Sequence, residues 1–460
     1  MKTFFINTLG CKVNQYESQQ IQELLEQLGL HKIKPPKKAD LVVINTCCVT
    51  HTASAKSRQY IRKAQKLSPD AVVVVCGCLP TVQINELHNI SKNVHLIRDR
   101  ERLADTLNKI ASGGSAALHF QSPQSCSNTN TIIKAQNGSK IKFKKELNSH
   151  SKLPILTAFQ DQTRAFLKVQ DGCDGHCSYC IVPQTRPIVH SKPIETVLKE
   201  AKSLVKAGHK EIVITGVFLG AYGQKSVKRR NWPNHRNVKL ANLLDKLAKI
   251  PNLARIRLSS LEPGDITRQL LDTFCKYPNI LPHLHLSLQS GSNAILKKMR
   301  RQYTSDIFIE KVALIKQYLD RPAITTDIIV GFPGETDDDF KQTVDLAKEA
   351  GFTKMHVFSF SSRKGTTAAR MRPRVDSKIT KERSKKLHKL NIQLSKKFQR
   401  QFIGETAEIL LENTNGRIYG LSERYFKVYL DKTKKKLMKN DLVRAKIVRY
   451  GKKGLYGDTL

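Results

Sequence analysis

Three cysteines, Cys173, Cys177 and Cys180, stand close together in a C-x3-C-x2-C spacing. Three thiolates on one loop can bind three irons of a [4Fe–4S] cube and leave the fourth iron open to a small molecule. Low-potential clusters of this kind carry out one-electron chemistry. Zinc sites usually have four protein ligands in two pairs, and no second C-x2-C lies nearby, although His176 within the loop is a possible ligand. The spacing therefore favours iron–sulfur over zinc, and both over a group of buried structural thiols.

Five further cysteines follow three apolar segments near the N-terminus. Cys11 follows residues 3–8, Cys47 and Cys48 follow residues 41–45, and Cys76 and Cys78 follow residues 71–75. If these segments are parallel strands, their following loops meet at one edge of the sheet, where ligands bind in such folds. One thiolate from each loop would form a second tripod for a cluster. The alternative is that small buried cysteines fill the strand ends, so all five stay candidates on these grounds.

The elements that position these cysteines alternate between strand and helix over residues 1–110. Apolar residues recur at helical spacing over residues 15–28, which end at Gly29, and residues 56–67 form a basic helical segment. Apolar strand segments separate the helices. This strand–helix alternation predicts an N-terminal α/β domain with a parallel sheet.

The composition changes between residues 111 and 153, where Gly, Ser, Asn, Gln and Lys dominate and indicate a linker. Residues 154–375 then alternate again between strand and helix. Six strand–helix repeats predict a partial (β/α)6 barrel with its active loops at the carboxyl ends of the strands, and the cysteine loop follows the first strand. The strands are expected at residues 166–169, 211–215, 255–258, 285–288, 325–330 and 355–360, and helices at 193–207, 240–249 and 305–318.

Two more segments complete the chain. Residues 376–401 contain a strongly basic helix, expected at about 378–401, and residues 402–460 show short alternating segments between Asn, Gly and Lys turns. Segments at 405–411, 425–430 and 442–448 predict a small antiparallel β-barrel. The whole chain is therefore an α/β protein with a small β domain at its end.

The net charge is +40, from 79 Lys and Arg against 39 Asp and Glu. Such a surface usually binds a polyanion through phosphate neutralisation, and the clustering of fourteen basic residues against two acids in residues 361–400 favours a nucleic acid. Residues 224–239 form an apparent insertion with six basic residues and the single Trp232, which is either a solvated loop or an RNA contact.

The sequence also bears on location. No apolar run approaches the roughly 20 residues needed to span a membrane, and the N-terminus has no signal-peptide pattern. We therefore expect a cytoplasmic protein without membrane partners, in which ten cysteines serve metals or catalysis rather than disulfides.

The cysteine loop resembles the signature of the radical-SAM enzymes, in which an aromatic residue, here Tyr179, precedes the last cysteine. This resemblance implies that the cluster on Cys173, Cys177 and Cys180 binds S-adenosylmethionine and cleaves it reductively to a 5′-deoxyadenosyl radical. The cysteines would thus be catalytic as well as metal ligands.

The N-terminal segments Gly10–Asn14, Asn45–Cys47 and Gly77–Cys78 resemble the methylthiotransferase family. The resemblance implies a second [4Fe–4S] cluster on Cys11, Cys47 and Cys78 and leaves Cys48 and Cys76 as structural thiols. The C-terminal segment is similar to the TRAM domain, a small RNA-binding β-barrel.

Residues 163–173, 259–263 and 363–369 are most similar to the MtaB-type branch of that family. The branch implies methylthiolation of C2 of N6-threonylcarbamoyladenosine at position 37, beside the tRNA anticodon, with an electron donor as a further partner. The expected S-adenosylmethionine contacts are Gln289, Ser290 and Asp327, and Glu262 either contacts the cofactor or caps its loop. Pro187 departs from the family's Arg-Gly pattern and removes a backbone donor.

Three other functions stay open from the sequence. A sister enzyme would act on N6-isopentenyladenosine at position 37, and another would act on a ribosomal protein side chain. A metal-containing RNA-binding protein without catalytic activity belongs to a different class.

Overall fold

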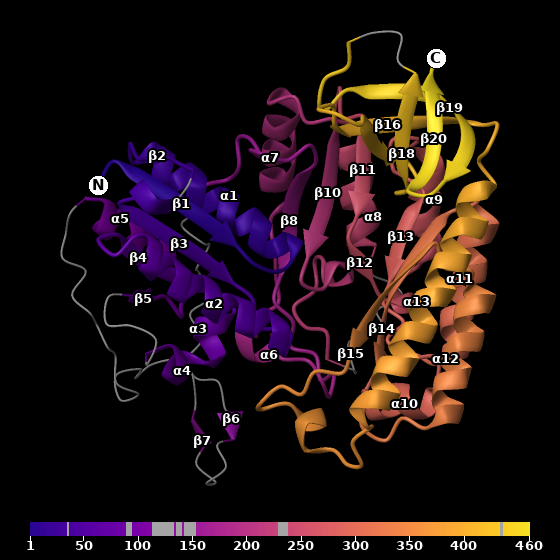
Figure 1. Ribbon diagram of the computed structural model, residues 1–460, viewed down its shortest axis with the longest axis horizontal. Helices are drawn as coiled ribbons and strands as arrows, with labels where there is room; N and C mark the ends of the chain where they lie inside the picture. The colour runs from indigo at the N-terminus through magenta and orange to yellow at the C-terminus, as the bar shows by residue number, and fades with distance from the viewer. Residues whose placement is uncertain are drawn as a thin grey trace. The chain divides into compact units, whose positions relative to one another are not determined.

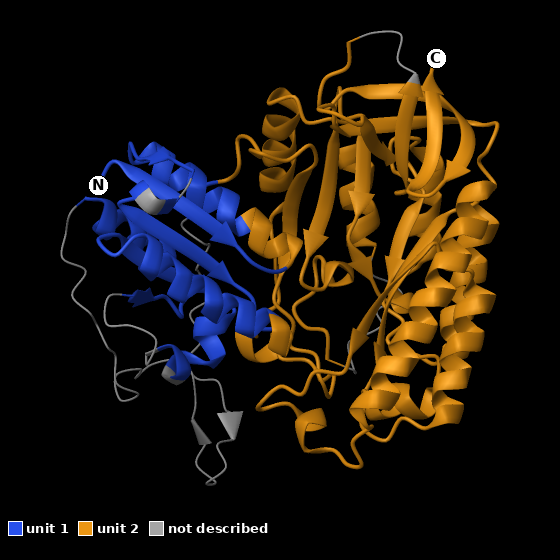
Figure 2. Cartoon of the chain, in the orientation of Figure 1, with its two compact units in different colours: residues 1–10, 17–48, 53–154 blue, residues 11–16, 49–52, 155–460 orange. Residues whose placement is uncertain are grey.

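The structure is a computed structural model of the 460-residue chain, and it describes residues 1–34, 36–88, 94–112, 133–134, 140–141, 153–228, 238–432 and 436–460. Two compact units divide the chain (Figure 2). Unit 1 contains Met1–Gly10, Glu17–Cys48 and Ala53–Pro154, and unit 2 contains Cys11–Tyr16, Val49–Thr52 and Ile155–Leu460. Most of the linker expected at residues 111–153, including Cys126, lies outside the described residues, as do residues 229–237 with Trp232.

Unit 1 is built on a parallel five-stranded sheet in the order β2-β1-β3-β4-β5 (Figure 1). The predicted N-terminal parallel α/β fold is confirmed. Alternating residues such as Phe4, Leu41, Val43 and Val74 pack with the apolar faces of the helices in one core. The elements are β1 Thr3–Thr8, α1 Lys12–Gln27, β2 His31–Lys32, β3 Leu41–Thr46, α2 His51–Leu67, β4 Val72–Gly77, α3 Leu79–Val82, α4 Ile84–His88, β5 Val94–Leu96 and α5 Leu103–Ala111, with short strands β6 Ile133–Lys134 and β7 Lys140–Ile141. The first residues of α1 and α2, 12–16 and 51–52, are counted with unit 2.

Unit 2 contains two four-stranded sheets, β11-β10-β8-β9 and β12-β13-β14-β15, in which every pair is parallel except β8 with the short β9. With β11 and β12 counted as one interrupted strand, the parallel strands number six. A single chain segment joins the sheets, because β11 runs through Ser259 directly into β12. The six strand positions agree with the predicted partial barrel. The strands are β8 Ala165–Asp171, β9 His190–Ser191, β10 Glu211–Gly216, β11 Arg255–Leu258, β12 Ser260–Leu261, β13 His283–Leu286, β14 Ala323–Val330 and β15 Lys354–Ser359.

Helices follow the strands and bury one side of them in the largest hydrophobic core of the chain. Helix α12 begins with a capping box between Thr336 and Asp339 and ends at Gly351 in the left-handed conformation, both of which fix its length. The helices are α6 Val182–Thr185, α7 Ile194–Lys206, α8 Lys239–Ala248, α9 Arg268–Lys276, α10 Asn293–Lys298, α11 Ser305–Tyr318 and α12 Asp337–Ala350.

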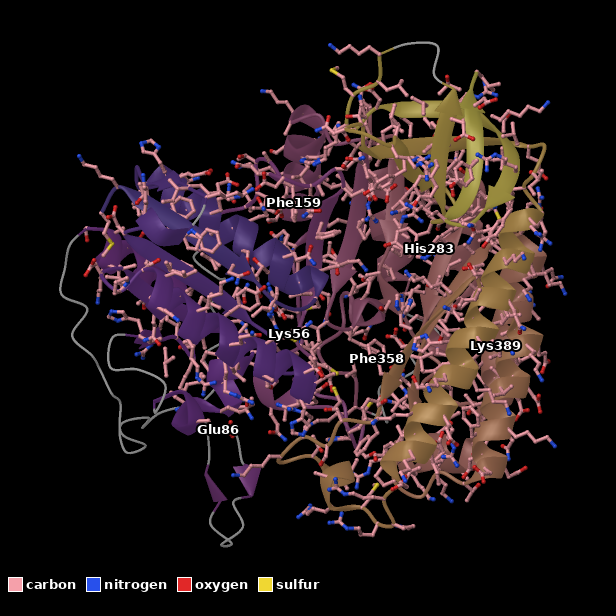
Figure 3. All side chains as sticks on the ribbon, viewed as in Figure 1. Lys56, Glu86, Phe159, His283, Phe358 and Lys389 are labelled. Atoms are coloured by element: carbon pink, nitrogen blue, oxygen red, sulfur yellow. The ribbon has the colours of Figure 1, made fainter. Side chains whose placement is uncertain are left out.

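The basic helix α13 Ser377–Arg400 runs beside β15 and α12 (Figure 1). Its buried Arg383 pairs with Glu335 at 2.9 Å and with Asp337 at 2.7 Å, which anchors the helix. Its remaining basic residues face solvent, as Lys389 in Figure 3 illustrates. The exposed ones are Lys378, Lys381, Lys385, Lys386, Lys389, Lys396, Lys397 and Arg400.

The C-terminal segment closes into a five-stranded barrel in the order β16-β17-β18-β20-β19. Every neighbouring pair is antiparallel except β18 and β20, whose parallel pairing closes the barrel. The strands are β16 Thr406–Asn413, β17 Tyr419–Ser422, β18 Lys427–Lys432, β19 Leu442–Gly451 and β20 Gly454–Thr459.

Two buried arginines at the start of β11 attach this small barrel to the parallel strands. Arg255 donates to the carbonyls of Glu408 and Leu421, and Arg257 donates to those of Ser422 and Glu423. Both also pair with buried Glu211, at 3.6 Å and 2.9 Å. Burial alone would raise the pKa of Glu211, but the arginine charges bring it below its usual value.

None of the described helices is both long enough and apolar enough to cross a membrane.

Candidate active site

The cysteine loop leaves the carboxyl end of β8, and the chain returns to the start of the loop just after α6. The backbone N–H of Cys173 donates to the carbonyl of Arg186 at 2.9 Å, and that of Cys180 donates to the carbonyl of Cys177 at 3.1 Å. The three thiols are therefore held on one short loop at the strand end, where ligands bind in parallel-sheet proteins.

Gly172 makes this closure possible. Its φ is +76°, and a Cβ at this position would lie 1.7 Å from the carbonyl oxygen of Ile188. The side chain of Arg186 donates to both carboxylate oxygens of Asp171, at 2.7 and 2.8 Å, and fixes the returning strand. Because the loop uses the carbonyl of Arg186, the missing N–H of Pro187 does not affect this closure.

Two N–H groups point at sulfur atoms of the loop. The backbone N–H of Gly175 donates to Cys173 Sγ at 3.4 Å, and the guanidinium of Arg301 donates to Cys177 Sγ at 3.2 Å. Burial raises the pKa of Cys173 and Cys180 to about 12, so a bound metal must displace their protons. Donors aimed at sulfur favour thiolates that carry a cluster.

The sulfurs of the loop are not gathered as tightly as the ligands of one zinc ion. Sulfur ligands of one tetrahedral zinc lie roughly 3.8 Å apart, given Zn–S bonds of about 2.3 Å. Among the described residues, the one group of three ligand atoms all within 4.8 Å of one another is His285, Asp327 and His356, and not the cysteine loop. At least one pair of the loop's sulfurs therefore lies further apart than in such a zinc site, and three thiols are the ligand set of a [4Fe–4S] cluster with one open iron.

Sequence reasoning missed Arg301 and Tyr303, which support the loop from a segment more than 120 residues later. Arg301 forms a buried ion pair with Glu262, and its guanidinium also lies 5.0 Å from the centre of the Tyr303 ring. The Tyr303 hydroxyl donates to the carbonyls of Ser287 and Leu288 at the end of β13. Burial lowers the pKa of Arg301, but the charge of Glu262 more than compensates, so its pKa is well above the usual value.

We expect Arg301→Gln to lower the free energy of unfolding by about 3–5 kcal/mol, because it leaves Glu262 buried without its partner. Denaturant unfolding measured by circular dichroism checks this value. The double variant Arg301→Gln/Glu262→Gln should recover most of the loss, since neither position then carries a charge. An equal loss in the single and double variants would contradict this explanation.

The N-terminal cysteines follow adjacent strands of the unit 1 sheet in register. Thr8 pairs with Asn45 and Asn45 pairs with Cys76, so β1, β3 and β4 end side by side. Cys47 comes two residues after Asn45, Cys78 comes two residues after Cys76, and Cys11 comes three residues after Thr8. The three loops therefore leave the same edge of one sheet, as the sequence predicts.

The five N-terminal cysteines differ in their surroundings. Cys76 packs in the hydrophobic core of unit 1, and Cys48 is fully buried. Cys78, at the start of α3, accepts a hydrogen bond from the Arg100 guanidinium at 3.4 Å. Gly77, just before it, has a φ of +91°, and a Cβ there would meet the Thr46 backbone at 2.5 Å. These contacts favour packing roles for Cys48 and Cys76.

The other predicted site residues lie on β13, β14 and the loop after β13. Gln289 has a φ of +67°, and its backbone bridges β14 through Asp327 and Ile329. Ser290 is buried, and its hydroxyl lies 3.4 Å from Thr343 Oγ1. Asp327 lies 3.3 Å from a ring nitrogen of His285. Gln289 is thus held in a strained backbone conformation, which is common at functional sites.

The start of the basic insertion contacts the cysteine loop. The Ser226 hydroxyl donates to Asp174 at 2.6 Å, and the backbone N–H of Val227 donates to the same carboxylate at 2.8 Å. The first residues of the insertion therefore support the loop, whereas Trp232 lies outside the described residues.

The C-terminal barrel carries three tyrosines in a row across neighbouring strands. The Tyr429 ring lies 5.7 Å from Tyr419 and stacks on Tyr456 at 5.3 Å. Lys427 lies 3.9 Å above the Tyr419 ring, and Arg449 lies 3.8 Å above the Tyr456 ring. Aromatic rings bordered by cations are suited to stacking bases and binding phosphates of RNA.

Two family models match the chain. Residues 167–347 match the Radical SAM superfamily, and residues 3–99 match a family described as Uncharacterized protein family UPF0004. A threonylcarbamoyladenosine tRNA methylthiotransferase MtaB of Bacillus subtilis is 36% identical over 98% of this chain and 95% of its own length. A tRNA-2-methylthio-N(6)-dimethylallyladenosine synthase of Thermodesulfovibrio yellowstonii is 28% identical over 100% of this chain and 99% of its own.

A solved structure shares the fold. The radical S-adenosylmethionine methyltransferase TsrM from Kitasatospora setae, with cobalamin and a [4Fe–4S] cluster bound, matches with a TM-score of 0.53 at 14% identity. The match covers 90% of this chain and 78% of that chain. The predicted fold class is thereby confirmed.

Proposed function

Because the chain belongs to the family of MtaB-type threonylcarbamoyladenosine tRNA methylthiotransferases, we propose that it adds a methylthio group to C2 of N6-threonylcarbamoyladenosine at position 37 of tRNA. The observation that carries this proposal at the site is the closed loop of Cys173, Cys177 and Cys180 with N–H donors on its sulfurs. The C–H bond at C2 is unactivated, so acid–base side chains alone would not break it.

Cys173, Cys177 and Cys180 would hold one [4Fe–4S] cluster, and S-adenosylmethionine would bind beside it. Bound there, this pair supplies the one-electron chemistry that breaks a C–H bond. The chain's own contribution is to fix the three cysteines on one loop and to donate hydrogen bonds from Gly175 and Arg301 to two of the sulfurs. Gln289 and Ser290 are proposed cofactor contacts, and an electron donor must supply the reducing equivalent.

Cys11, Cys47 and Cys78 would hold the second cluster, next to which sulfur is delivered. The register of β1, β3 and β4 supports this assignment, because the loops that carry the three cysteines leave the same edge of the sheet. The N–H donor from Arg100 to Cys78 fits a thiolate ligand. We assign residues 1–110 to this cluster, residues 154–375 to the radical chemistry and residues 111–153 to the linker.

The basic helix of residues 376–401 and the barrel of residues 402–460 are proposed to hold the tRNA. The exposed lysines of α13 neutralise phosphates, and the partly exposed Tyr419 and Tyr429 offer rings for stacking. A base in the anticodon loop is easier to extrude than a base in a duplex. A tRNA substrate supports the proposed cytoplasmic location.

Mass spectrometry of nucleosides from digested tRNA tests the proposed function. A strain that lacks the gene should lose 2-methylthio-N6-threonylcarbamoyladenosine and keep the 2-methylthio derivative of N6-dimethylallyladenosine. The reverse pattern would identify the sister activity instead. A purified protein that contains zinc and no iron after anaerobic reconstitution would identify an RNA-binding protein without catalysis.

A further inference from the structure

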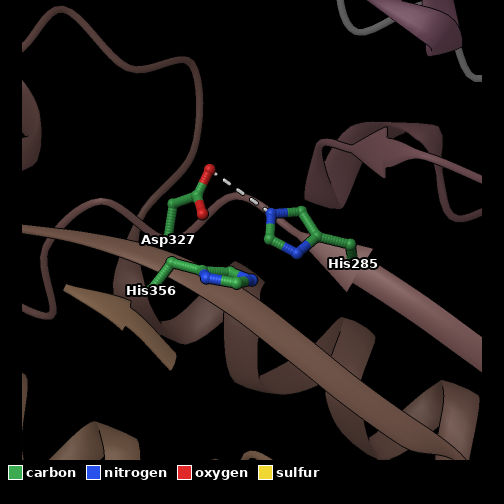
Figure 4. A group of neighbouring side chains, drawn as sticks. All are labelled: His285, Asp327 and His356. Atoms are coloured by element: carbon green, nitrogen blue, oxygen red, sulfur yellow. Dashed lines mark ion pairs between the residues drawn. The ribbon is translucent and has the colours of Figure 1, made fainter. Parts of the chain in front are cut away.

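Three side chains from adjacent parallel strands meet in unit 2, and none of them belongs to the cysteine loop. His285 of β13, Asp327 of β14 and His356 of β15 place one nitrogen or oxygen atom each within 4.8 Å of one another (Figure 4). His285 Nε2 lies 3.3 Å from Asp327 Oδ2, and the two rings are 5.8 Å apart. No function assigned above uses the two histidines.

These side chains face away from the hydrophobic core. Leu284, Leu286 and Ile328 on the same strands belong to that core. Because side chains alternate between the two faces of a strand, His285 and Asp327 point to the opposite face. On β15, Met355 faces the core and its neighbour His356 does not. The three side chains therefore line the side of the sheet that the helices leave uncovered.

Thr325 and His283 hold the ring of His285 in its orientation. Its Nδ1 lies 2.9 Å from the hydroxyl of Thr325, and that hydroxyl also lies 3.3 Å from Nε2 of His283. Nε2 of His285 is buried and makes no hydrogen bond to any described residue. Burial lowers the pKa of His356, against the opposing charge of Asp327, so this ring is neutral and keeps one donor and one acceptor. The group thus presents unused polar atoms on one face.

A cation lies within electrostatic range of Asp327 and His356. Lys12 is half-buried and belongs to the segment Cys11–Tyr16 of unit 2. Burial lowers its pKa, and the charges of Tyr425 and Asp327 oppose that change. Within the described part of the chain, Lys12 forms no ion pair. An ammonium, a carboxylate and two imidazoles together offer partners for an anion, for N–H or hydroxyl donors and for a carbonyl.

The group lies close to the cysteine loop. Ser287 is on the same face of the strand as His285 and two residues further along, about 7 Å away. The carbonyl of Ser287 accepts from Tyr303, which packs against Arg301, and Arg301 donates to Cys177. A nucleoside that reacts beside the cysteine loop can therefore extend a substituent of a few bonds to His285.

We propose that Lys12, His285, Asp327 and His356 form the subsite that binds the threonylcarbamoyl group of the substrate. This inference rests on the proposed function and names the residues that select its substrate. Lys12 binds the threonyl carboxylate, Asp327 accepts from the hydroxyl or a ureido N–H, and the imidazoles complete the hydrogen bonds. Asp327, expected from the sequence to contact the cofactor, thereby serves the substrate.

The polarity of the subsite explains why a dimethylallyl group would be rejected. That group has no polar atom, so binding it would take water from four polar side chains without replacing the hydrogen bonds. Sites built around a substrate's polar groups discriminate against apolar analogues by about 10⁴-fold or more. A divalent metal is another ligand that two imidazoles and a carboxylate can bind, but the ammonium of Lys12 opposes it.

The test compares anticodon stem–loop RNAs that carry N6-threonylcarbamoyladenosine or plain adenosine at position 37, with the cluster-loaded protein. Fluorescence anisotropy gives the ratio of the two dissociation constants. We expect wild type to prefer the modified RNA, and Lys12→Met and His356→Leu each to reduce that preference at least tenfold. Lys12→Arg should restore most of it. Lys348→Met, an exposed lysine on α12, is the matched control and should leave the ratio unchanged.

Each other outcome overturns the inference in a recognisable way. If the wild-type protein methylthiolates the modified RNA but binds both RNAs equally, the proposed subsite is refuted and the proposed function is not. An unchanged ratio in both folded variants does the same. Equimolar zinc binding that disappears in His356→Leu, together with a preference abolished by EDTA, would assign the group to a metal. Wild-type activity on dimethylallyladenosine RNA alone would refute the function itself.

Discussion

Cys177→Ala is expected to abolish cleavage of S-adenosylmethionine while RNA binding survives. Cys177 is the middle thiol of the loop, and it is the one whose sulfur receives the Arg301 guanidinium. Two remaining thiolates cannot hold three corners of a cube, so the iron content after anaerobic reconstitution should fall from about eight to about four per chain. Chromatographic measurement of 5′-deoxyadenosine checks the cleavage, and a chemical assay checks the iron.

The matched control for this prediction is Cys275→Ala. Cys275 lies on α9, is exposed, and donates only to the carbonyl of Tyr318. This variant should keep about eight irons and full cleavage. Undiminished cleavage in Cys177→Ala would refute the assignment of the loop, whatever the RNA binding shows.

Cys47→Ala should have the complementary effect, in which cleavage persists and the methylthio product disappears. Cys47 follows β3, the central strand of the three whose loops carry the proposed second cluster. Its loss should remove one cube, again leaving about four irons. Mass spectrometry of the RNA product, with 5′-deoxyadenosine measured in the same reaction, distinguishes loss of sulfur delivery from loss of radical formation.

Cys48→Ala is the control for this second prediction, because it changes the next residue in the same loop. Cys48 is fully buried, and its replacement costs packing but no proposed ligand. Product formation should therefore persist in Cys48→Ala. If Cys48→Ala lost the product and Cys47→Ala kept it, the ligand assignment would move by one residue.

Much of this architecture can be predicted from local patterns. The strand–helix alternation places β1 and α11 at the residues observed, and the three strand-end loops follow from parallel pairing. The cysteine spacing identifies the loop itself. Each of these inferences depends on residues close together in sequence, where periodicity and turn chemistry act directly.

What the sequence did not reveal depends on contacts between distant segments. Arg301 and Tyr303 follow a short helix in an ordinary basic stretch, and nothing local indicates that they return to Cys177 and Ser287. His285, Asp327 and His356 likewise meet only because three strands align in register. In the C-terminal barrel, β17 contains one glycine and β20 contains two, which weakens their strand pattern, so local patterns do not predict the parallel closure by β20.

The buried Arg255 and Arg257 have a consequence for how the enzyme selects one nucleotide. They bind four carbonyls of the small barrel to the beginning of the parallel strands, whereas the thiols lie beyond the opposite ends of those strands. A strand such as β8, seven residues long, spans about 23 Å. The distance between the C-terminal barrel, which is proposed to bind RNA, and the cysteine loop is therefore fixed by the length of the strands. A tRNA bound at the barrel would then present to the cysteine loop only a nucleotide that lies at this fixed distance from the bound segment.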